Sequence, residues 1–223
     1  MATDNTSANP RFSVIMIVND NARELEENLP AYLEQDFVSG YEIIIVDASS
    51  ADDTDDVITH FKNQLALAEQ THVSRLYTTF LPKPHFGASS QRMALTLGVK
   101  AARNEWIIFT DIHRKPTPTW LSELAEFTTG NTKVMLGYEQ KNGDIRLQLF
   151  NEIEDVRCHV GKAERRQTNS HKGRMMNYLR GKYDMIVVKA NQGHNLLRLY
   201  ELNIQGSQLL GYRLRTFFYN LFH

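Results

Sequence analysis

The fold is decided by residues 12–50, which read FSVIMIVNDNARELEENLPAYLEQDFVSGYEIIIVDASS. Two short apolar runs in this stretch, residues 12–18 and 42–46, have the β-branched composition of strands buried on both faces of a parallel sheet. Between them, apolar side chains recur at helical spacing and glutamates occupy the opposite positions. The apolar positions are Leu25, Leu29, Tyr32 and Leu33, and the glutamates expected to face solvent are Glu24, Glu26 and Glu27. The stretch therefore predicts strand, helix and strand in succession.

The same alternation continues to residue 127. A second amphipathic helix is expected after residue 50, and four aspartates near its first turn complement the helix dipole. These are Asp52, Asp53, Asp55 and Asp56. Strands are expected at residues 74–80 and 105–110, separated by a helix over about 89–102 whose small residues, Gly98 among them, allow close packing. Pro118 is expected to open the next helix, with Thr117 as its N-cap.

The pattern changes after Gly130. Residues 134–139 and 145–150 flank an Asn-Gly turn and predict a hairpin. Residues 151–180 are polar and basic and are interpreted as loop and helix, followed by a strand over 184–190 and a final helix. No linker composition interrupts the chain, so residues 11–223 are expected to form one domain after a disordered tail, residues 1–10. The predicted fold class is α/β, with a doubly wound, mostly parallel sheet and helices on both faces.

Composition excludes several classes of protein. Lys and Arg number 25 against 26 Asp and Glu, which gives no general attraction for nucleic acid. Cys158 is the single cysteine, and the first ten residues are polar where a signal peptide would be apolar. No apolar run approaches the ~20 residues that a membrane span needs. A cytoplasmic protein is therefore expected. The glycine motifs of dinucleotide and P-loop enzymes are missing, and Asp20 alone matches a receiver domain poorly.

Polar residues follow three of the expected strands, at the sheet edge where such folds bind ligands. Asp47 and Asp111 can each accept hydrogen bonds from a nucleobase or ribose, although a loop aspartate is equally explained as a turn former. The triplet Asp111-Ile112-His113 is more specific, because a carboxylate and an imidazole suit Mn²⁺ better than Mg²⁺. Such an ion would neutralise a diphosphate leaving group. The alternative is that His113 is a solvated loop histidine.

Three segments together resemble family 2 glycosyltransferases. They are SVIMIVNDNARELEENLPAYLEQDF, YEIIIVDASSADDT and RMALTLGVKAARNEWIIFTDIHRKPTPTWLSEL, within residues 12–127. The resemblance implies the GT-A fold and inverting transfer of a sugar from a nucleotide diphosphate to a glycan or lipid-linked acceptor. Residues 11–130 would then bind the nucleotide-sugar and residues 131–223 would form the acceptor side.

The resemblance also assigns roles to residues. Asp47 would contact the base, Arg92 would lie near the diphosphate, and Asp111 and His113 would hold the metal. The remaining nucleotide-sugar contacts would come from Val18, Asn19 and Ser49. This chain departs from the family at Asn19-Asp20, where tyrosine or arginine then asparagine is usual, and at Asp47-Ala48, where two aspartates are usual. A UDP- or a GDP-linked donor therefore stays open.

The general base is the largest departure. The segment LLGYRLR, residues 209–215, resembles the tail of the motif in which a glutamate-aspartate pair carries the base, and that pair falls on Gly206 and Ser207. A serine cannot take up the acceptor's proton at neutral pH. Glu201, six residues upstream of Ser207, is the candidate substitute. The alternative is a sugar-nucleotide-binding or scaffolding relative that does not catalyse transfer.

The remaining polar residues give weaker evidence for a functional site. Histidines that could complete a metal shell, or simply lie at the surface, are His159, His171 and His194. The basic residues between 162 and 182 suit a phosphorylated acceptor or an anionic lipid headgroup, or form a solvated loop. The aromatic and basic residues 213–222 are compatible with peripheral contact with the inner membrane face and with packing onto the domain. A homodimer also stays open.

Overall fold

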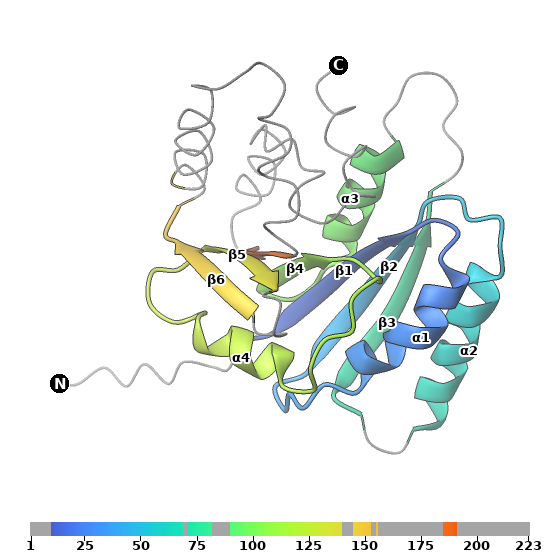
Figure 1. The fold of residues 1–223 in the computed structure, drawn as a ribbon, viewed down its shortest axis with the longest axis horizontal. Coiled ribbons are helices and arrows are strands. Elements are labelled where there is room, and N and C mark those ends of the chain that lie inside the picture. The colour runs from blue at the N-terminus through green and yellow to red at the C-terminus, as the bar shows by residue number, and fades with distance from the viewer. Residues whose placement is uncertain are drawn as a thin grey trace.

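The computed structural model describes residues 10–68, 71–81, 90–139, 145–152, 155 and 185–190. These residues form a seven-stranded sheet with the strand order β3-β2-β1-β4-β7-β5-β6 (Figure 1). The strands are β1 Phe12–Val18, β2 Tyr41–Asp47, β3 Val73–Phe80, β4 Trp106–Thr110, β5 Val134–Glu139, β6 Ile145–Phe150 and β7 Met185–Lys189. Each lies within one residue of the bounds expected from the sequence.

The sheet combines a parallel half with an antiparallel half. Strands β3, β2, β1 and β4 pair parallel with one another, whereas β7 pairs antiparallel with both β4 and β5, and β5 pairs antiparallel with β6. The predicted hairpin is therefore present, and β7 lies between it and the parallel strands although it is the last of the described strands in sequence. The expected doubly wound, mostly parallel α/β fold is confirmed.

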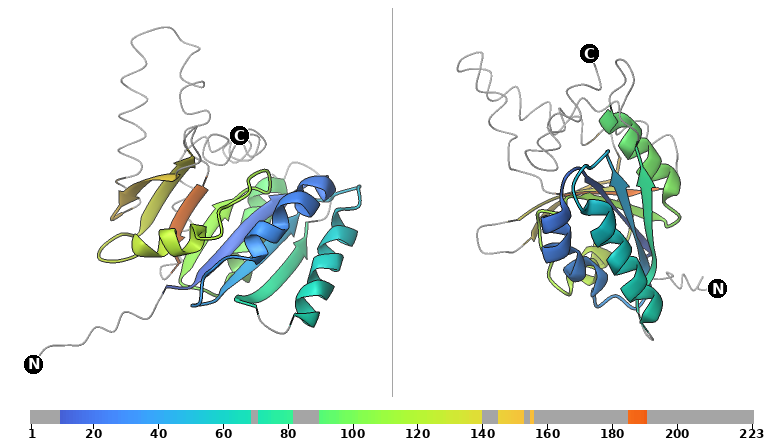
Figure 2. Two further views of the ribbon diagram at one scale, coloured as in Figure 1. Left: turned by 60° about the horizontal axis from the view of Figure 1, so that its bottom comes forward. Right: turned by 90° about the vertical axis from the view of Figure 1, so that its right-hand side faces the viewer.

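Helices lie on both faces of the sheet (Figure 2). On one face lie α1 Ala22–Leu33, α2 Thr54–Leu67 and α4 Trp120–Glu126, and on the other lies α3 Ser90–Ala101. The first three bury their apolar stripes in one core cluster with Phe12, Val14 and Met16 of β1. Helix α3 buries Ala94 and Leu95 in a second cluster with Ile15.

Helix α3 packs very close to the sheet, as its small residues predict. A Cβ atom built on Gly98 would lie 2.7 Å from Cγ2 of Ile15 in β1 and 3.3 Å from Cγ2 of Val46 in β2. Ordinary carbon contacts are about 3.5 to 4.0 Å. Only glycine therefore allows this approach of the helix to the two central strands.

A buried charge network fixes the C-terminal end of α3, close to Gly98. The carboxylate of Glu42 accepts hydrogen bonds from the Ser13 hydroxyl at 2.6 Å and the backbone N–H of Arg103 at 2.6 Å. Its other oxygen pairs with the guanidinium of Arg75, which also donates to the carbonyl of Ala101 at 2.6 Å. The last turn of α3 is thus tied to three neighbouring strands.

One helix start differs from the prediction. Helix α4 begins at Trp120 with Thr119 as its N-cap, and not at Pro118 after Thr117. The reason is that the Thr117 carbonyl already closes a turn to the N–H of Trp120 and accepts a second hydrogen bond from Gln35. The predicted tail up to residue 9, the hairpin turn, residues 156–180 and the final helix lie outside the described residues. Within the described part of the chain, no helix is both long and apolar enough to cross a bilayer.

Candidate functional site

The carboxyl ends of the parallel strands bring the predicted polar residues to one edge of the sheet. Val18 pairs with Asp47 in the β1–β2 register, and Met16 pairs with Thr110 in the β1–β4 register. Asp111 directly follows Thr110, so Asp47 and Asp111 lie on strands that flank β1 on either side. Two strand spacings separate them, about 10 Å. We expected the two aspartates to lie at one edge from the sequence alone, because ligands of such sheets bind beyond the strand ends.

Two loops at this edge are joined by hydrogen bonds. We call them the clasp loops: residues 19–21, between β1 and α1, and residues 48–53, between β2 and α2. Asn19, Asp20 and Ala22, the first residue of α1, donate to the second loop, and Ala51 donates back to the first. The contacts are Asn19 Nδ2 to the Ala48 carbonyl at 2.9 Å, Asp20 N–H to Ser50 Oγ at 3.0 Å, Ala51 N–H to Asp20 Oδ1 at 2.7 Å, and Ala22 N–H to Asp52 Oδ2 at 3.0 Å.

The clasp loops contain strained backbone. Asp20 has φ 53° and Ser49 has φ 67°, a left-handed conformation that is uncommon for residues other than glycine. The carboxylate of Asp20 is held by Ala51, and the Ser49 hydroxyl donates to the carbonyl of Leu81. Such strain persists only where surrounding contacts impose it, and it is concentrated at functional sites.

Asp47 lies beneath the clasp loops and is 4% exposed. Its Oδ1 accepts hydrogen bonds from the Ser50 N–H at 2.8 Å and the Ser50 hydroxyl at 2.7 Å. No described residue donates to Oδ2, which is therefore available to a ligand's N–H or O–H. Val18 is fully buried beside it, and its carbonyl accepts from Ala48 at 2.8 Å.

Asp52 does more than complement the dipole of α2. Burial raises the pKa of its carboxyl, but hydrogen bonds from Thr54 and from the backbone N–H of Ala22 outweigh that effect, so the pKa lies below its usual value. The charged form of Asp52 thus joins the first turns of α1 and α2. Sequence reasoning placed this residue correctly but did not identify the contact with α1.

The triplet Asp111-Ile112-His113 forms a tight turn after β4. Asp111 Oδ1 accepts a hydrogen bond from the backbone N–H of His113 at 3.0 Å. The His113 ring is 36% exposed, and its Nδ1 lies 3.5 Å from Oε1 of Glu24. No group of three or more metal-ligating side chains occurs among the described residues. Within the described part of the chain, this turn supplies two side chains of a kind that can bind a divalent ion.

Helix α1 holds all three residues of that turn. The Tyr32 hydroxyl donates to the carbonyl of Asp111 at 2.9 Å, and the Asn28 side-chain amide donates to the carbonyl of Ile112 at 2.8 Å. Glu24 faces His113 one turn earlier, and not solvent as the sequence predicted. Burial raises the pKa of the Tyr32 phenol well above its usual range, so the phenol stays a donor. The four-residue spacing of polar groups at positions 24, 28 and 32 is the signal that sequence reasoning missed.

Several predicted site residues cannot be placed. Arg92 lies in the first turn of α3, at the same edge of the sheet, but its side chain is outside the described part of the structure. Other candidates outside the described residues are His159, His171, His194, Glu201 and Ser207. The roles of these residues stay predictions.

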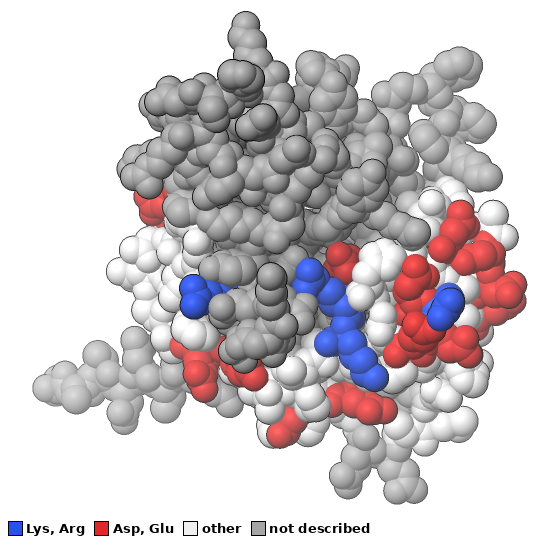
Figure 3. All heavy atoms as spheres, viewed as in Figure 1, with Lys and Arg blue, Asp and Glu red and all other residues white. Residues whose placement is uncertain are grey.

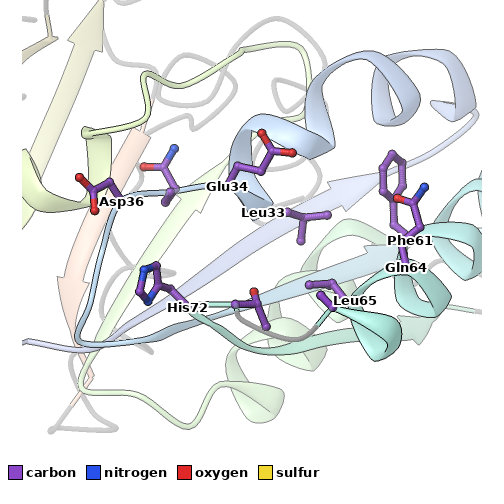
Figure 4. Close-up of a pocket in the computed structure, with 10 residues that line it drawn as sticks. Leu33, Glu34, Asp36, Phe61, Gln64, Leu65 and His72 are labelled. Carbon is purple, nitrogen blue, oxygen red and sulfur yellow. The ribbon is translucent and has the colours of Figure 1, made fainter.

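The described surface has two further features. A cavity of about 450 Å³ lies at the opposite edge of the sheet, between the C-terminal ends of α1 and α2 and the start of β3, and includes Leu33, Phe61 and His72 (Figure 4). It is separate from the strand-end site. Acidic side chains gather at the N-terminal ends of α1 and α2 (Figure 3). The exposed members beside the clasp loops are Asp20, Asp52, Asp53, Asp55 and Asp56.

Solved structures of similar fold include a mannosyltransferase and the protein TarS. The mannosyltransferase PcManGT from Pyrobaculum calidifontis, in complex with GDP-Man and Mn²⁺, superposes with a TM-score of 0.53 at 16% identity over 88% of this chain and 53% of that chain. The crystal structure of S. aureus TarS gives 0.54 at 15% identity over 95% of this chain and 33% of that chain. The chain thus spans about half or less of these proteins, and at such identity the likeness shows the GT-A fold alone. No curated protein matches the sequence.

A family comparison covers most of the chain. The sequence model of "Glycosyl transferase family 2" matches residues 13–203, a range that contains Asp47, Arg92 and the Asp111–His113 turn. This agrees with the resemblance carried by the three N-terminal segments and confirms the predicted class of protein. The chain belongs to glycosyl transferase family 2.

Proposed function

We propose that this chain is an inverting, metal-dependent glycosyltransferase that moves a sugar from a UDP- or GDP-linked donor to a glycan or lipid-linked acceptor. The observation that carries the proposal is the placement of Asp47 and Asp111 at the ends of β2 and β4, on either side of β1. A nucleoside diphosphate can extend along this edge, with its base at the clasp loops and its diphosphate at the Asp111–His113 turn.

Asp47 supports the choice of nucleotide. Its Oδ1 is occupied by Ser50, and its Oδ2 is left to accept a hydrogen bond. Uracil and guanine each carry a ring N–H on the edge that pairs with other bases. Cytosine and adenine have an unprotonated ring nitrogen there, which would face the carboxylate lone pairs unfavourably. The buried carboxylate therefore favours uridine or guanosine diphosphates.

Local charge supports the requirement for a metal. The site borders the acidic side chains of Asp20, Asp52 and Asp53, which would repel a diphosphate. Asp111 and His113 are a carboxylate and an imidazole on one turn, a donor pair that suits Mn²⁺. A divalent ion held there would neutralise the diphosphate and stabilise it as a leaving group. Residues 111 and 113 would fix the position of that charge, and the first turn of α3 brings Arg92 to the same edge.

Transfer then requires an acceptor hydroxyl and a base. The hydroxyl oxygen attacks the anomeric carbon from the face opposite the phosphate; the new C–O bond forms as the bond to the phosphate oxygen breaks, and that oxygen takes the electron pair. The proton of the hydroxyl goes to a carboxylate, for which Glu201 is our candidate, because Ser207 cannot accept it. We place the acceptor at the cytoplasmic membrane face.

Nucleotide binding tests the role of Asp47. We expect UDP or GDP, with Mn²⁺, to bind at least tenfold more tightly than CDP or ADP in calorimetric titrations. Asp47→Asn keeps the oxygen that Ser50 holds but replaces the free oxygen with an NH₂ group. It should cost tenfold to hundredfold in affinity for the preferred nucleotide, about 1.5–3 kcal/mol for a charged hydrogen bond. Asp36→Asn, an exposed change at the opposite edge, is the control. Equal binding of all four nucleotides would refute this assignment.

Turnover separates transfer from binding alone. Incubation with Mn²⁺ and a panel of UDP- and GDP-sugars should release nucleoside diphosphate, faster with a suitable acceptor, and chelation of the metal should stop the release. The alternative, a relative that binds donor without transferring it, is favoured by Gly206 and Ser207 at the position of the family's acidic pair. Saturable binding with no release under any condition would establish that alternative.

A further inference from the structure

Three polar side chains of α1 follow one another at four-residue intervals and contact three consecutive residues of the turn after β4. Tyr32 and Asn28 donate to the carbonyls of Asp111 and Ile112, at 2.9 and 2.8 Å. Glu24 completes the series with its carboxylate 3.5 Å from Nδ1 of His113. Residues four apart lie on one face of a helix, so Glu24, Asn28 and Tyr32 together position the backbone of the turn and the ring of His113.

From this geometry we infer that Glu24 is a positioning residue for His113, a role that rests on the function proposed above. Glu24 faces Nδ1, so it selects the imidazole tautomer that carries its proton on Nδ1 and leaves Nε2 as the nitrogen with a free lone pair. A histidine that binds a metal commonly donates its other ring N–H to a carboxylate, and this contact fixes the ring and makes the ligand more basic. Asn28 and Tyr32 fix the backbone on which the ring is mounted.

The surroundings of Glu24 agree with this role. Its side chain is 30% exposed, whereas Glu27 on the same helix is 55% exposed and pairs with Arg23 at 2.8 Å. The distance of 3.5 Å between Glu24 and His113 is longer than a hydrogen bond of about 2.9 Å. Contacts of this kind tighten when a ligand draws the ring into place.

The tautomer of His113 is the first test, and it needs no ligand. Long-range proton–nitrogen NMR of the free protein, recorded at alkaline pH so that the neutral imidazole is observed, identifies the protonated nitrogen. Loss of one signal in His113→Gln assigns the spectrum. We expect the Nδ1–H form in the wild type and in Glu24→Gln, which keeps an oxygen acceptor, and a shift toward Nε2–H in Glu24→Ala. An Nε2–H form in the wild type would overturn the inference.

Metal affinity is the second test. The loss of the free Mn²⁺ resonance signal on titration with protein, in the presence of the preferred nucleoside diphosphate, gives the affinity directly. We expect Glu24→Ala to weaken it tenfold to hundredfold, and Glu24→Gln to weaken it less. Glu26→Ala removes the same charge from an exposed position on the far side of α1 and should leave it unchanged. Circular dichroism of each variant checks that the fold is kept.

The outcomes separate the two proposals. A wild-type protein that does not bind Mn²⁺ with either nucleotide overturns the metal-dependent function, and with it the role of Glu24 in metal binding. Wild-type binding that Glu24→Ala leaves intact, or that Glu26→Ala weakens as much, overturns the role of Glu24 alone. Selective loss in Glu24→Ala, together with the change of tautomer, establishes it.

Discussion

Replacing Gly98 by alanine tests how α3 is seated on the sheet. In an ordinary helix interior this change stabilises by about 1 kcal/mol, because glycine is the more flexible residue. Here the new methyl group would lie 2.7 Å from Cγ2 of Ile15, about 1 Å inside a normal contact. Ile15 is 1% exposed on a central strand and its branched side chain has little freedom to move. Overpacking of this kind costs about 1–3 kcal/mol.

The two effects together give an expected net loss of about 1 kcal/mol in the free energy of unfolding. For a chain of this size that corresponds to a fall of about 2–4 °C in Tm. Urea unfolding followed by tryptophan fluorescence measures the first quantity and calorimetry the second. The sign matters more than the size, since an unobstructed glycine in a helix would give the opposite result.

A double-mutant cycle isolates the contact with Ile15. In an Ile15→Ala background the obstructing methyl is gone, so Gly98→Ala should stabilise by about 1 kcal/mol and the coupling energy should be about 2 kcal/mol. Ile15→Val is the matched control, because valine keeps the methyl at this position and the loss should persist. Additive effects in the alanine background, or a rise in Tm from Gly98→Ala alone, would refute the reasoning.

Two further perturbations concern buried polar groups. Burial raises the pKa of the Tyr32 and Tyr41 phenols, so the folded state keeps protons that the unfolded chain releases above about pH 10. The free energy of unfolding should therefore fall as the pH rises past that value, and it should fall less in Tyr41→Phe. Urea unfolding midpoints at pH 8 and pH 11 measure this fall. Glu42→Gln breaks the buried pair with Arg75 and should cost about 3 kcal/mol, whereas Glu105→Gln, at an exposed pair, should cost less than about 1 kcal/mol in the same assay. Equal costs at the two glutamates would contradict the buried role of Glu42.

Local pattern was enough to predict most of the fold. Buried parallel strands are apolar on both faces, so β1, β2 and β4 are visible as continuous runs between polar turns. The predicted start of α4 was wrong. Pro118 favours the first turn of a helix, but Thr117 instead forms a turn that is held by a contact with Gln35 of a distant segment. Sequence pattern reports local preference, and long-range hydrogen bonds can override it.

The site was predictable in position but not in detail. The rule that ligands bind beyond strand ends located Asp47 and Asp111, since it depends only on strand order and direction. Glu24 was assigned to solvent because a helical pattern distinguishes apolar from polar faces and does not reveal a polar face that contacts another loop. Asn19 was expected to contact nucleotide, a role that stays a prediction, and the structure shows its amide bound to the Ala48 carbonyl.

The contact between Glu24 and His113 limits how this triplet can change over evolution or by engineering. An aspartate at position 113 would bring a second carboxylate toward Glu24. Two like charges about 4 Å apart repel by roughly 1–4 kcal/mol near a protein surface. The exchange would therefore require a neutral or basic residue at position 24 at the same time, so residues 24 and 113 should vary as a pair.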